Sequence, residues 1–444
     1  MTTTNTGNAT PPEPDRSYLE QLAAQTERKV ASAEPLDSEH IGAPAAVRAR
    51  ITAALDSHEG KLVELAHRLH AEPELGYEEH RSVRAVAELL SAAGHEPQVG
   101  AYGLTTALRV VAGSGHPRVA ILAEYDALPG IGHACGHNVI CASAVGAFLG
   151  LSDAVEELGG SVELIGTPAE EGGGGKEHIA RAGGFDEVDV AVMVHPYGYD
   201  LAEHPFVGRR IVDVVYKGVA AHAAAMPFMG RNALDGVVAA YTGIAALRQH
   251  LPPTDRVHGV ITDGGERPNI VPEHAAAQFY LRSAEPDTLI DLCRRATAVF
   301  EGAAAMTGTA VDVQWDPAPA YLPIRHNLTL AARYAVHLAE RGRQVLPRGI
   351  VPDTLTGSTD LGNVSVRIPA IHPMIAIAPS TVSLHTTQFA EHAGGPEADR
   401  AVLDAAVGLA LVGADFLADP ALRDAVAAEF AEAGGPLDVA SLLA

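Results

Sequence analysis

VAILAEYDALPGIGHACGHN, residues 119–138, joins a short apolar run to a loop that holds glycines and potential metal ligands. The run Val119–Ala123 lies between charged residues, which predicts a buried strand of a parallel sheet. In the following sequence, apolar runs at Val162–Ile165 and Val188–Val194 alternate with helical patterns at 139–151 and 175–182. This alternation predicts a βαβ region and an α/β fold.

A different pattern occupies residues 211–324. Strands are predicted at Ile211–Tyr216, Val257–Ile261, Ala275–Arg282 and Thr309–Trp315, and helices at Asn232–Arg248 and 286–306. The order β-α-β-β-α-β is typical of a ferredoxin-like unit. We therefore predict an inserted α+β domain at 211–324 within a catalytic domain made of residues 16–210 and 325–444.

The flanking segments complete this organisation. Residues 1–15 are rich in Thr, Asn and Pro, which predicts a disordered tail. The block 16–92 has helical periodicity. After the insertion, a strand at Ile371–Ile377 and an Ala-rich helix at about 396–418 resume the α/β pattern.

Composition excludes several classes of protein. Of 444 residues, 47% are hydrophobic, 31 are basic and 55 are acidic, which gives a net charge of −24. This composition excludes a disordered chain, and the negative charge argues against nucleic acid and anionic membranes as partners. The three cysteines form no C-x-x-C pair, the first residues have no apolar segment, and apolar runs such as Ala405–Ala414 are shorter than a membrane span. We expect a soluble, cytoplasmic protein.

Potential ligands follow successive predicted strands. Cys135 and His137 follow the first, Glu170 and Glu171 in TPAEEGGGGK follow the second, and His195 follows the third. His385 follows the late strand. Open α/β sheets build their sites at the carboxyl ends of strands, and Zn²⁺ accepts thiolate and imidazole together. Each residue alone also fits an ordinary role as a buried cysteine, an acidic turn or a loop histidine.

The residue spacings that define several other catalytic motifs are absent from the sequence. The sequence contains neither G-x-S-x-G nor H-E-x-x-H, and it lacks the deaminase pattern H-x-E with P-C-x-x-C. The glycines before Lys176 do not make a phosphate loop, because Glu170 stands at the first required Gly and Glu177 replaces the required Ser or Thr. Nucleophilic-serine and zincin mechanisms are therefore poor candidates.

Six motifs in order resemble the M20 metallopeptidases. They are AEYDALPGIGHACGHN (123–138), GTPAEEGGGGK (166–176), MVHP (193–196), AAHAAAMPFMGRNALD (220–235), RPNIVPEHA (267–275) and GSTDLGNVS (357–365). Within that family the chain is most similar to the amidohydrolase branch of p-aminobenzoyl-glutamate hydrolase and β-alanyl-lysine dipeptidase, over about residues 60–395. The resemblance implies a dinuclear-metal catalytic domain with an inserted lid domain that also forms a homodimer.

The resemblance also implies roles for individual residues. The implied metal ligands are Cys135, His137, Glu171, His195 and His385. Glu170 would be the catalytic carboxylate, and Asp126 would support a ligating histidine. His222 would reach the scissile carbonyl, often from the partner subunit, or would otherwise be a structural residue beside a helix.

Two further residues match positions that hold the substrate in the family. Asn269 is one, and Arg282, whose guanidinium suits a terminal carboxylate, is the other. An internal ion pair is the alternative role for Arg282. Asn138 fits the dipeptidase-like branch, whereas Gln388 stands where an acidic residue is common.

The expected activity is hydrolysis of the amide bond of an N-acyl amino acid or dipeptide. A metal-activated water would attack, with Glu170 as general base and His222 as oxyanion donor. The thiolate favours two Zn²⁺ ions, with Mn²⁺ or Co²⁺ as alternatives. Two alternatives from other classes are a non-catalytic M20-like dimeric scaffold and a metal or redox sensor that uses Cys135.

Overall fold

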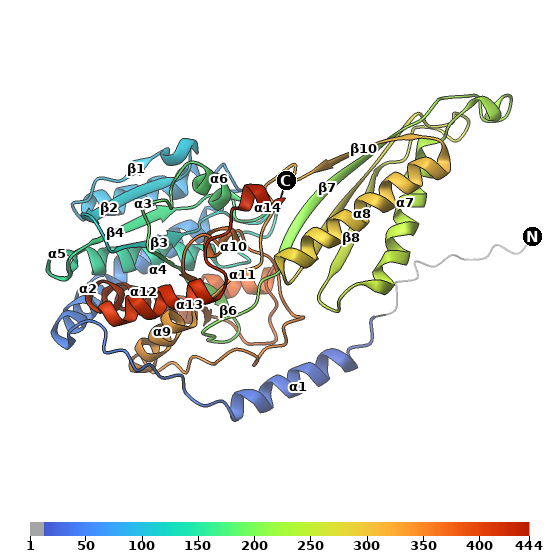
Figure 1. The fold of residues 1–444 in the computed structure, drawn as a ribbon. Helices are drawn as coiled ribbons and strands as arrows, with labels where there is room; N and C mark the ends of the chain where they lie inside the picture. The colour runs from blue at the N-terminus through green and yellow to red at the C-terminus, as the bar shows by residue number, and fades with distance from the viewer. Residues whose placement is uncertain (1–12, 444) are drawn as a thin grey trace, which may run out of the picture.

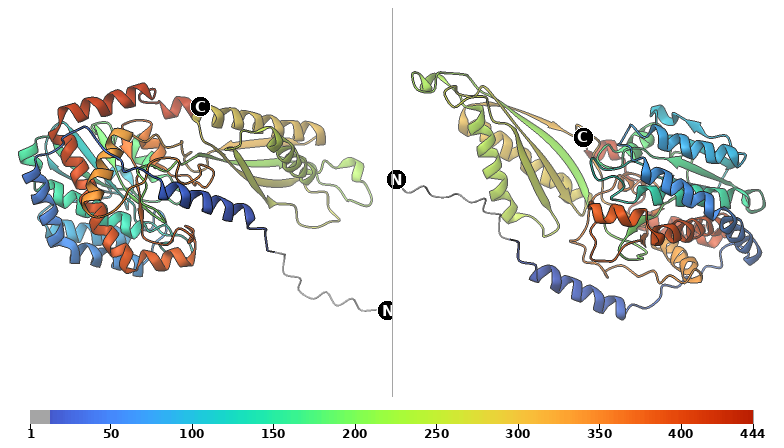
Figure 2. Two further views of the ribbon diagram at one scale, coloured as in Figure 1. Left: turned by 90° about the horizontal axis from the view of Figure 1, so that it is seen from below. Right: turned by 180° about the vertical axis from the view of Figure 1, so that it is seen from behind.

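The computed structural model describes residues 13–443 and places them in two units that lie end to end (Figures 1 and 2). The second unit comprises residues 208–315, and the main unit comprises the other described residues. The predicted tail lies outside the described residues over positions 1–12, and residues 13–15 are exposed and without regular structure.

A six-stranded sheet of order β1-β2-β4-β3-β5-β11 forms the centre of the main unit. Its strands are β1 (Gln98–Val99), β2 (Leu108–Gly113), β3 (Arg118–Ala123), β4 (Ser161–Gly166), β5 (Val190–Val192) and β11 (Ala370–Ile371). The predicted parallel pairing is confirmed for β3 with β4 and with β5. β1 and β2, which the sequence did not indicate, add an antiparallel edge.

Helices cover both faces of this sheet, because β3 is apolar on both sides. Val119 and Ile121 face the large core under α2 (Ala45–Ala71), α4 (His137–Ser152) and α12 (Pro396–Ala418). Ala120 and Leu122 face a smaller core with α6 (Gly175–Arg181) and α10 (Leu361–Ser365). Successive side chains of a strand point to opposite faces, so one apolar run serves both layers.

The strand predicted at 188–194 is shorter in the structure, since only β5 lies within it, and the strand predicted at 371–377 is wrong as a continuous element. After a short break the same two segments pair again in the same register, as β6 (His195–Tyr197) with β12 (Met374–Ala376), in a separate parallel ribbon. Pro373 lies at the break and has no N–H to donate to a ladder. His195 therefore begins a short strand instead of following a long one.

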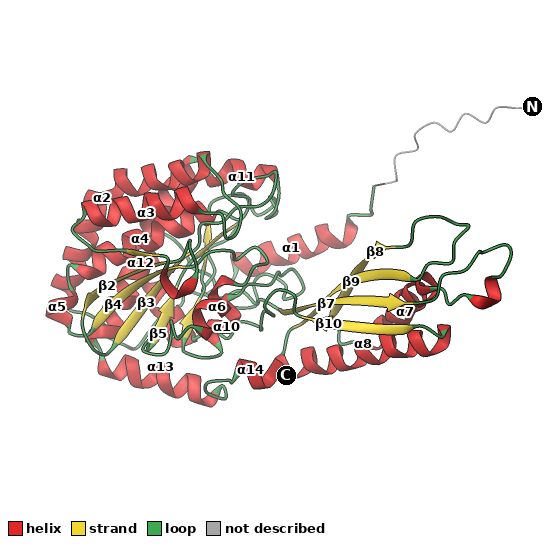
Figure 3. Cartoon of the chain, turned by 90° about the horizontal axis from the view of Figure 1, so that it is seen from above, coloured by secondary structure: helices red, strands yellow, loops and turns green. Residues whose placement is uncertain are grey.

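The second unit has its own antiparallel sheet of order β10-β7-β9-β8 (Figure 3). Its elements are β7 (Gly208–Lys217), α7 (Ala233–Leu247), β8 (Arg256–Asp263), β9 (His274–Ser283), α8 (Pro286–Thr307) and β10 (Ala310–Trp315). The six elements predicted here are confirmed within a few residues. Both helices pack on one face of the sheet, over a core that includes Tyr216, Phe279 and Phe300.

The remaining helices surround the main unit. They are α1 (Ser17–Ala31), α3 (His80–Ala92), α5 (Val155–Leu158), α9 (Leu328–Glu340), α11 (Thr387–Ala393), α13 (Pro420–Glu432) and α14 (Val439–Leu443), with a 3-10 turn at Ala101–Gly103. Two further 3-10 turns, Pro227–Met229 and Arg248–His250, belong to the second unit. By length and composition alone α12 is long and apolar enough to cross a membrane, which the shorter run Ala405–Ala414 did not indicate. Most of α12 is buried against α2, α4 and α9, as expected for a core helix.

Candidate metal centre and active site

Seven residues singled out in the sequence come together at the carboxyl ends of the central strands. Asp126 and the loop to Cys135 follow β3, and Glu170 and Glu171 follow β4. His195 is the first residue of β6, which begins shortly after β5 ends at Val192. His385 arrives from the turn before α11, where its backbone N–H donates to the carbonyl of Ala134. The remaining member of the group is His137, the first residue of α4.

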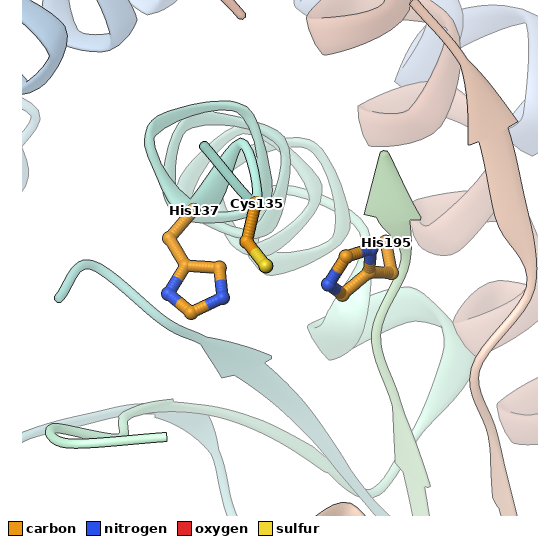
Figure 4. A group of neighbouring side chains, drawn as sticks. All are labelled: Cys135, His137 and His195. Atoms are coloured by element: carbon orange, nitrogen blue, oxygen red, sulfur yellow. The ribbon is translucent and has the colours of Figure 1, made fainter. Parts of the chain in front are cut away.

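Two groups of three potential ligands share the sulfur of Cys135. Cys135, His137 and His195 form one group, and Cys135, Glu171 and His385 form the other, with ligand atoms within 4.8 Å of one another in each group. Figure 4 shows the Cys135 sulfur between the rings of His137 and His195. The His385 Nε2 lies 2.9 Å from the same sulfur and 3.6 Å from Glu171 Oε1. This arrangement suits two cations held by one shared thiolate.

Hydrogen bonds orient the two buried histidines so that Nε2 faces the centre. His137 Nδ1 lies 3.1 Å from Asp126 Oδ1, and the other Asp126 oxygen accepts the backbone N–H of Glu171 at 2.9 Å. His195 Nδ1 donates to the carbonyl of Pro196 at 2.7 Å. Such contacts leave Nε2 as the nitrogen that binds a metal.

Glycine is required where the ligand loop enters α4. Gly136 has φ of 74°, in the left-handed region, and a Cβ there would lie 2.8 Å from the Pro196 ring. Any larger residue would clash and move Cys135 or His137 on either side of it. The loop after β4 has the same need at Gly175, where a Cβ would lie 1.8 Å from the Pro168 carbonyl oxygen.

The charges of the site favour an added cation. Burial raises the pKa of Glu170 well above its usual range, and the negative charges of Glu124 and Glu171 raise it further. Burial and the charge of Glu171 likewise raise the pKa of the Cys135 thiol. Burial lowers the pKa of His195 to about 4, which keeps this ring neutral as a metal ligand requires.

The unpartnered atoms of the site are themselves ligand atoms. Among the described residues, His137 Nε2, Glu171 Oε1 and Glu124 Oε2 are buried without a hydrogen-bond partner. Buried polar atoms normally have partners, so atoms that converge without one need a ligand between them. The donor set of thiolate, imidazole and carboxylate therefore fits divalent metal ions.

A buried charged triad beside the centre was not singled out by sequence reasoning. Lys176 is fully buried and donates from Nζ to Glu124 at 2.5 Å and to Asp360 at 2.6 Å. Glu124 in turn places Oε2 3.4 Å from His137 Nε2. The only sequence signal was the position of each acid in a quoted motif, since a lysine after four glycines is usually a surface residue.

The other residues quoted from the sequence are at different places. Asn138 is buried, and its side-chain N–H₂ donates to the carbonyls of Ala66 and Ala393, which an Asp could not do. Gln388 is exposed on α11.

His222 and Asn269 lie at the far end of the second unit. Both are exposed, and Ala223 N–H donates to the Asn269 carbonyl at 3.1 Å. β7 leads to this end over ten residues, which span about 30 Å at roughly 3.3 Å per residue. The structure therefore does not bring these two residues to the metal centre of their own chain. Within its chain, His222 Nδ1 accepts hydrogen bonds from Ala224 N and Ala225 N.

Arg282 lies at the near end of β9, opposite Arg209 in the strand register. Arg209 stacks on the ring of Tyr321, and the Tyr321 hydroxyl contacts the carbonyl of Glu170. No ion pair to Arg282 is present among the described residues, so the alternative role in an internal ion pair finds no partner in this part of the chain. Its guanidinium lies 5.5 Å from the centre of the Tyr280 ring.

Comparison with known proteins identifies the family. The model of Peptidase family M20/M25/M40 matches residues 120–393. The chain belongs to the M20 peptidase family. A mouse Xaa-Arg dipeptidase is 39% identical over 86% of this chain and 92% of its own. One of the subunits of p-aminobenzoyl-glutamate hydrolase from Escherichia coli K12 is 29% identical, over 83% of this chain and 92% of its own.

A solved structure supports the fold. A Bacillus subtilis protein described as a dinuclear metal binding peptidase of the M20 family has a TM-score of 0.61 and 22% identity, over 79% of this chain and 98% of its own. As an M20 member the protein is a metal-dependent hydrolase of amide bonds. The comparisons give no support to a non-catalytic scaffold or a sensor.

Proposed function

We propose that this M20 enzyme binds two divalent ions that share Cys135. His137 and His195 would complete one site, and Glu171 and His385 the other. The presence of the Cys135 sulfur in both ligand groups is the observation that carries the proposal. A thiolate with imidazole ligands favours Zn²⁺ by its softness, with Mn²⁺ or Co²⁺ as alternatives.

Glu170 is proposed as the general base and then the general acid. Bound divalent ions would supply Lewis-acid catalysis, which makes a water acidic enough to lose a proton near neutral pH. Glu170 takes this proton as the water oxygen attacks the amide carbon, and it delivers the proton to the leaving nitrogen as the C–N bond breaks. Glu170 Oε2 lies 3.9 Å from His137 Nε2, so the base faces the ligand atoms. Asp126 keeps the His137 ring oriented throughout.

The proposed substrate is a dipeptide or another N-acyl amino acid. Support comes from the printed activities of two relatives, an Xaa-Arg dipeptidase and a p-aminobenzoyl-glutamate hydrolase. An Xaa-Arg dipeptide and p-aminobenzoyl-glutamate both have a carboxylate on the carbon next to the amide nitrogen. Arg282 would bind that carboxylate with two parallel hydrogen bonds, since its guanidinium has no acidic partner among the described residues.

A hydrolysis screen tests the proposed activity. We expect free amine from Xaa-Arg dipeptides, β-alanyl dipeptides or p-aminobenzoyl-glutamate after reconstitution with Zn²⁺, Mn²⁺ or Co²⁺. Chelation should reduce the rate to background, and added metal should restore it, because the chain alone supplies no Lewis acid. Circular dichroism of the chelated enzyme provides the control for intact fold. Full activity in protein shown by elemental analysis to be free of metal would disprove the proposal.

The second unit is proposed to be a ferredoxin-like lid that also forms a homodimer. Its strand order corresponds to 4-1-3-2 of a β-α-β-β-α-β chain, the order of that fold. Its far end exposes large apolar side chains, which need cover. They are Val219, Met226, Phe228, Met229 and Ile270. We propose that a second copy of the chain covers them.

His222 would then complete the active site of the partner subunit, as an oxyanion donor. It cannot act in its own chain across about 30 Å. Asn269 would accompany it, because the backbone hydrogen bond at Ala223 holds the two segments together. Three free, buried cysteines support our further proposal of a reducing, cytoplasmic location.

Complementation tests the action of His222 from the partner. His222→Ala alone should lower kcat by about 10²- to 10³-fold, as for loss of one oxyanion donor. Co-expression of equal amounts of His222→Ala and Glu170→Gln chains should restore about one quarter of wild-type activity, because about half of randomly formed C2 dimers are mixed and each mixed dimer has one of its two sites complete. Each variant expressed alone is the control. Equal inactivity of the mixed dimer, verified by mass, would show that His222 has no role in the partner's site.

A further inference from the structure

The hydroxyl of Tyr321 makes three hydrogen bonds to the loop that carries Glu170 and Glu171. It donates to the Glu170 carbonyl at 2.6 Å and accepts the backbone N–H groups of Gly172 at 3.1 Å and Gly174 at 3.0 Å. One donor and two acceptor positions are the full capacity of a phenolic hydroxyl. The tyrosine side chain is thus dedicated to this loop.

The loop needs such an anchor because of its glycines. Gly172 and Gly174 have φ of 101° and 68°, and they are part of a run of four glycines from 172 to 175. Glycine has more conformational freedom to lose than any other residue, so a run of glycines makes the backbone next to Glu170 flexible unless other groups hold it. The Glu170 carbonyl is the group held most closely, and its carbon is two bonds from the Cβ that starts the side chain of the proposed base.

Tyr321 is itself fixed to the second unit. Its backbone pairs with Arg209, the second residue of β7, through hydrogen bonds of 2.7 and 2.9 Å. The Arg209 guanidinium lies 3.9 Å from the centre of the Tyr321 ring, and Arg209 Nε has no hydrogen-bond partner among the described residues. A cation is attracted to the face of an aromatic ring, so the Arg209 guanidinium stabilises the orientation of the Tyr321 ring.

We propose that Tyr321 is a positioning residue for the general base, through which the seating of the second unit sets the position of Glu170. Tyr321 lies six residues after β10, the strand that leaves the second unit, and its hydroxyl is bonded to the loop of the main unit. A shift of the strand pair β7–β10 would therefore move the backbone of Glu170. The inference rests on the proposed role of Glu170 as base.

Tyr321→Phe removes the hydroxyl and keeps the ring under Arg209. We expect kcat to fall by about 10- to 100-fold, because a misplacement of the order of 1 Å reduces catalysis by this amount. KM should change by less than about twofold, since the phenol does not bind substrate. Hydrogen exchange of the Gly172 and Gly174 amides should become about tenfold faster, the effect of losing one hydrogen bond at each.

Tyr334→Phe is the matched control. Tyr334 is a fully buried tyrosine of α9 whose hydroxyl has no partner among the described residues. Its variant should keep the kcat and loop exchange of wild type. Unchanged kcat and unchanged exchange in Tyr321→Phe would overturn the inference, and so would a rise in KM alone.

Arg209→Gln provides a second variant if Tyr321→Phe does not fold. It keeps the hydroxyl but removes the cation over the ring, and we expect a smaller fall in kcat with faster loop exchange. Loop exchange identical to wild type in this variant would overturn the link to the second unit. Exchange is measured without turnover, so a failed role for Glu170 would leave the loop result intact and remain distinguishable.

Discussion

Glu170→Gln is expected to lower kcat by about 10²- to 10⁴-fold, the usual contribution of a positioned general acid and base. The amide has almost the shape of the carboxylate but cannot take a proton from the attacking water. Metal content should stay at the wild-type value, because the proposed ligands are Cys135, His137, His195, Glu171 and His385, although Glu170 itself lies beside His137 and Glu171. Steady-state kinetics with elemental analysis of the same sample measure both quantities.

The adjacent carboxylate gives the matched comparison. Glu171→Gln removes a proposed ligand, so we expect it to lose metal and activity together. Metal retained in Glu170→Gln but lost in Glu171→Gln would distinguish the general base from the metal ligand. Wild-type turnover in Glu170→Gln, or metal loss in that variant, would show that the two roles have been assigned wrongly.

Lys176→Met is expected to lower the free energy of unfolding by about 3–5 kcal/mol, the usual effect of removing one partner from a buried ion pair. Glu124 and Asp360 would then share a buried space with no positive charge. Even beside Lys176, burial and the charge of Glu124 raise the pKa of Asp360 to about 6. Methionine preserves the length of the side chain, so the loss reports mainly the charge. Urea unfolding of the chelated protein measures it.

An exposed ion pair provides the control for Lys176. Arg50 pairs with Glu157 at 2.6 Å, but both side chains are about half exposed. Arg50→Met should cost about 0–1 kcal/mol, because solvent screens surface pairs. A loss below 1 kcal/mol in Lys176→Met, similar to that of Arg50→Met, would contradict a stabilising role for the buried triad.

The main strands of the sheet were predictable because the sequence signal was local. Val119–Ala123 and Val162–Ile165 are buried on both faces, and such strands appear as continuous apolar runs. The run at 371–377 is also largely apolar, yet it is divided between two sheets, and the run at 188–194 forms only the three-residue strand β5. The break lies at Pro373, and the apolar pattern alone did not indicate where pairing would be interrupted.

The convergence of the candidate ligand residues was also predictable, since they follow predicted strands and strand ends gather at one edge of an α/β sheet. The sequence did not indicate which residues far apart in the chain lie close together in the fold. Lys176 looks like a surface residue until its partners Glu124 and Asp360 are placed around it. Tyr321 has no motif of its own, and only the packing of the two units brings its hydroxyl to the loop of Glu170.

By itself, the sequence determined the α/β pattern, the order of the inserted elements and the chemical types of the ligands, because these depend on residues close together in the chain. The tertiary structure alone decided that Cys135 is common to two ligand groups, and that His385, 250 residues later, contacts its sulfur. It also decided that His222 and Asn269 lie a strand length away from that centre. Contacts between distant segments follow from how whole layers pack, and no local pattern of residues specifies that packing.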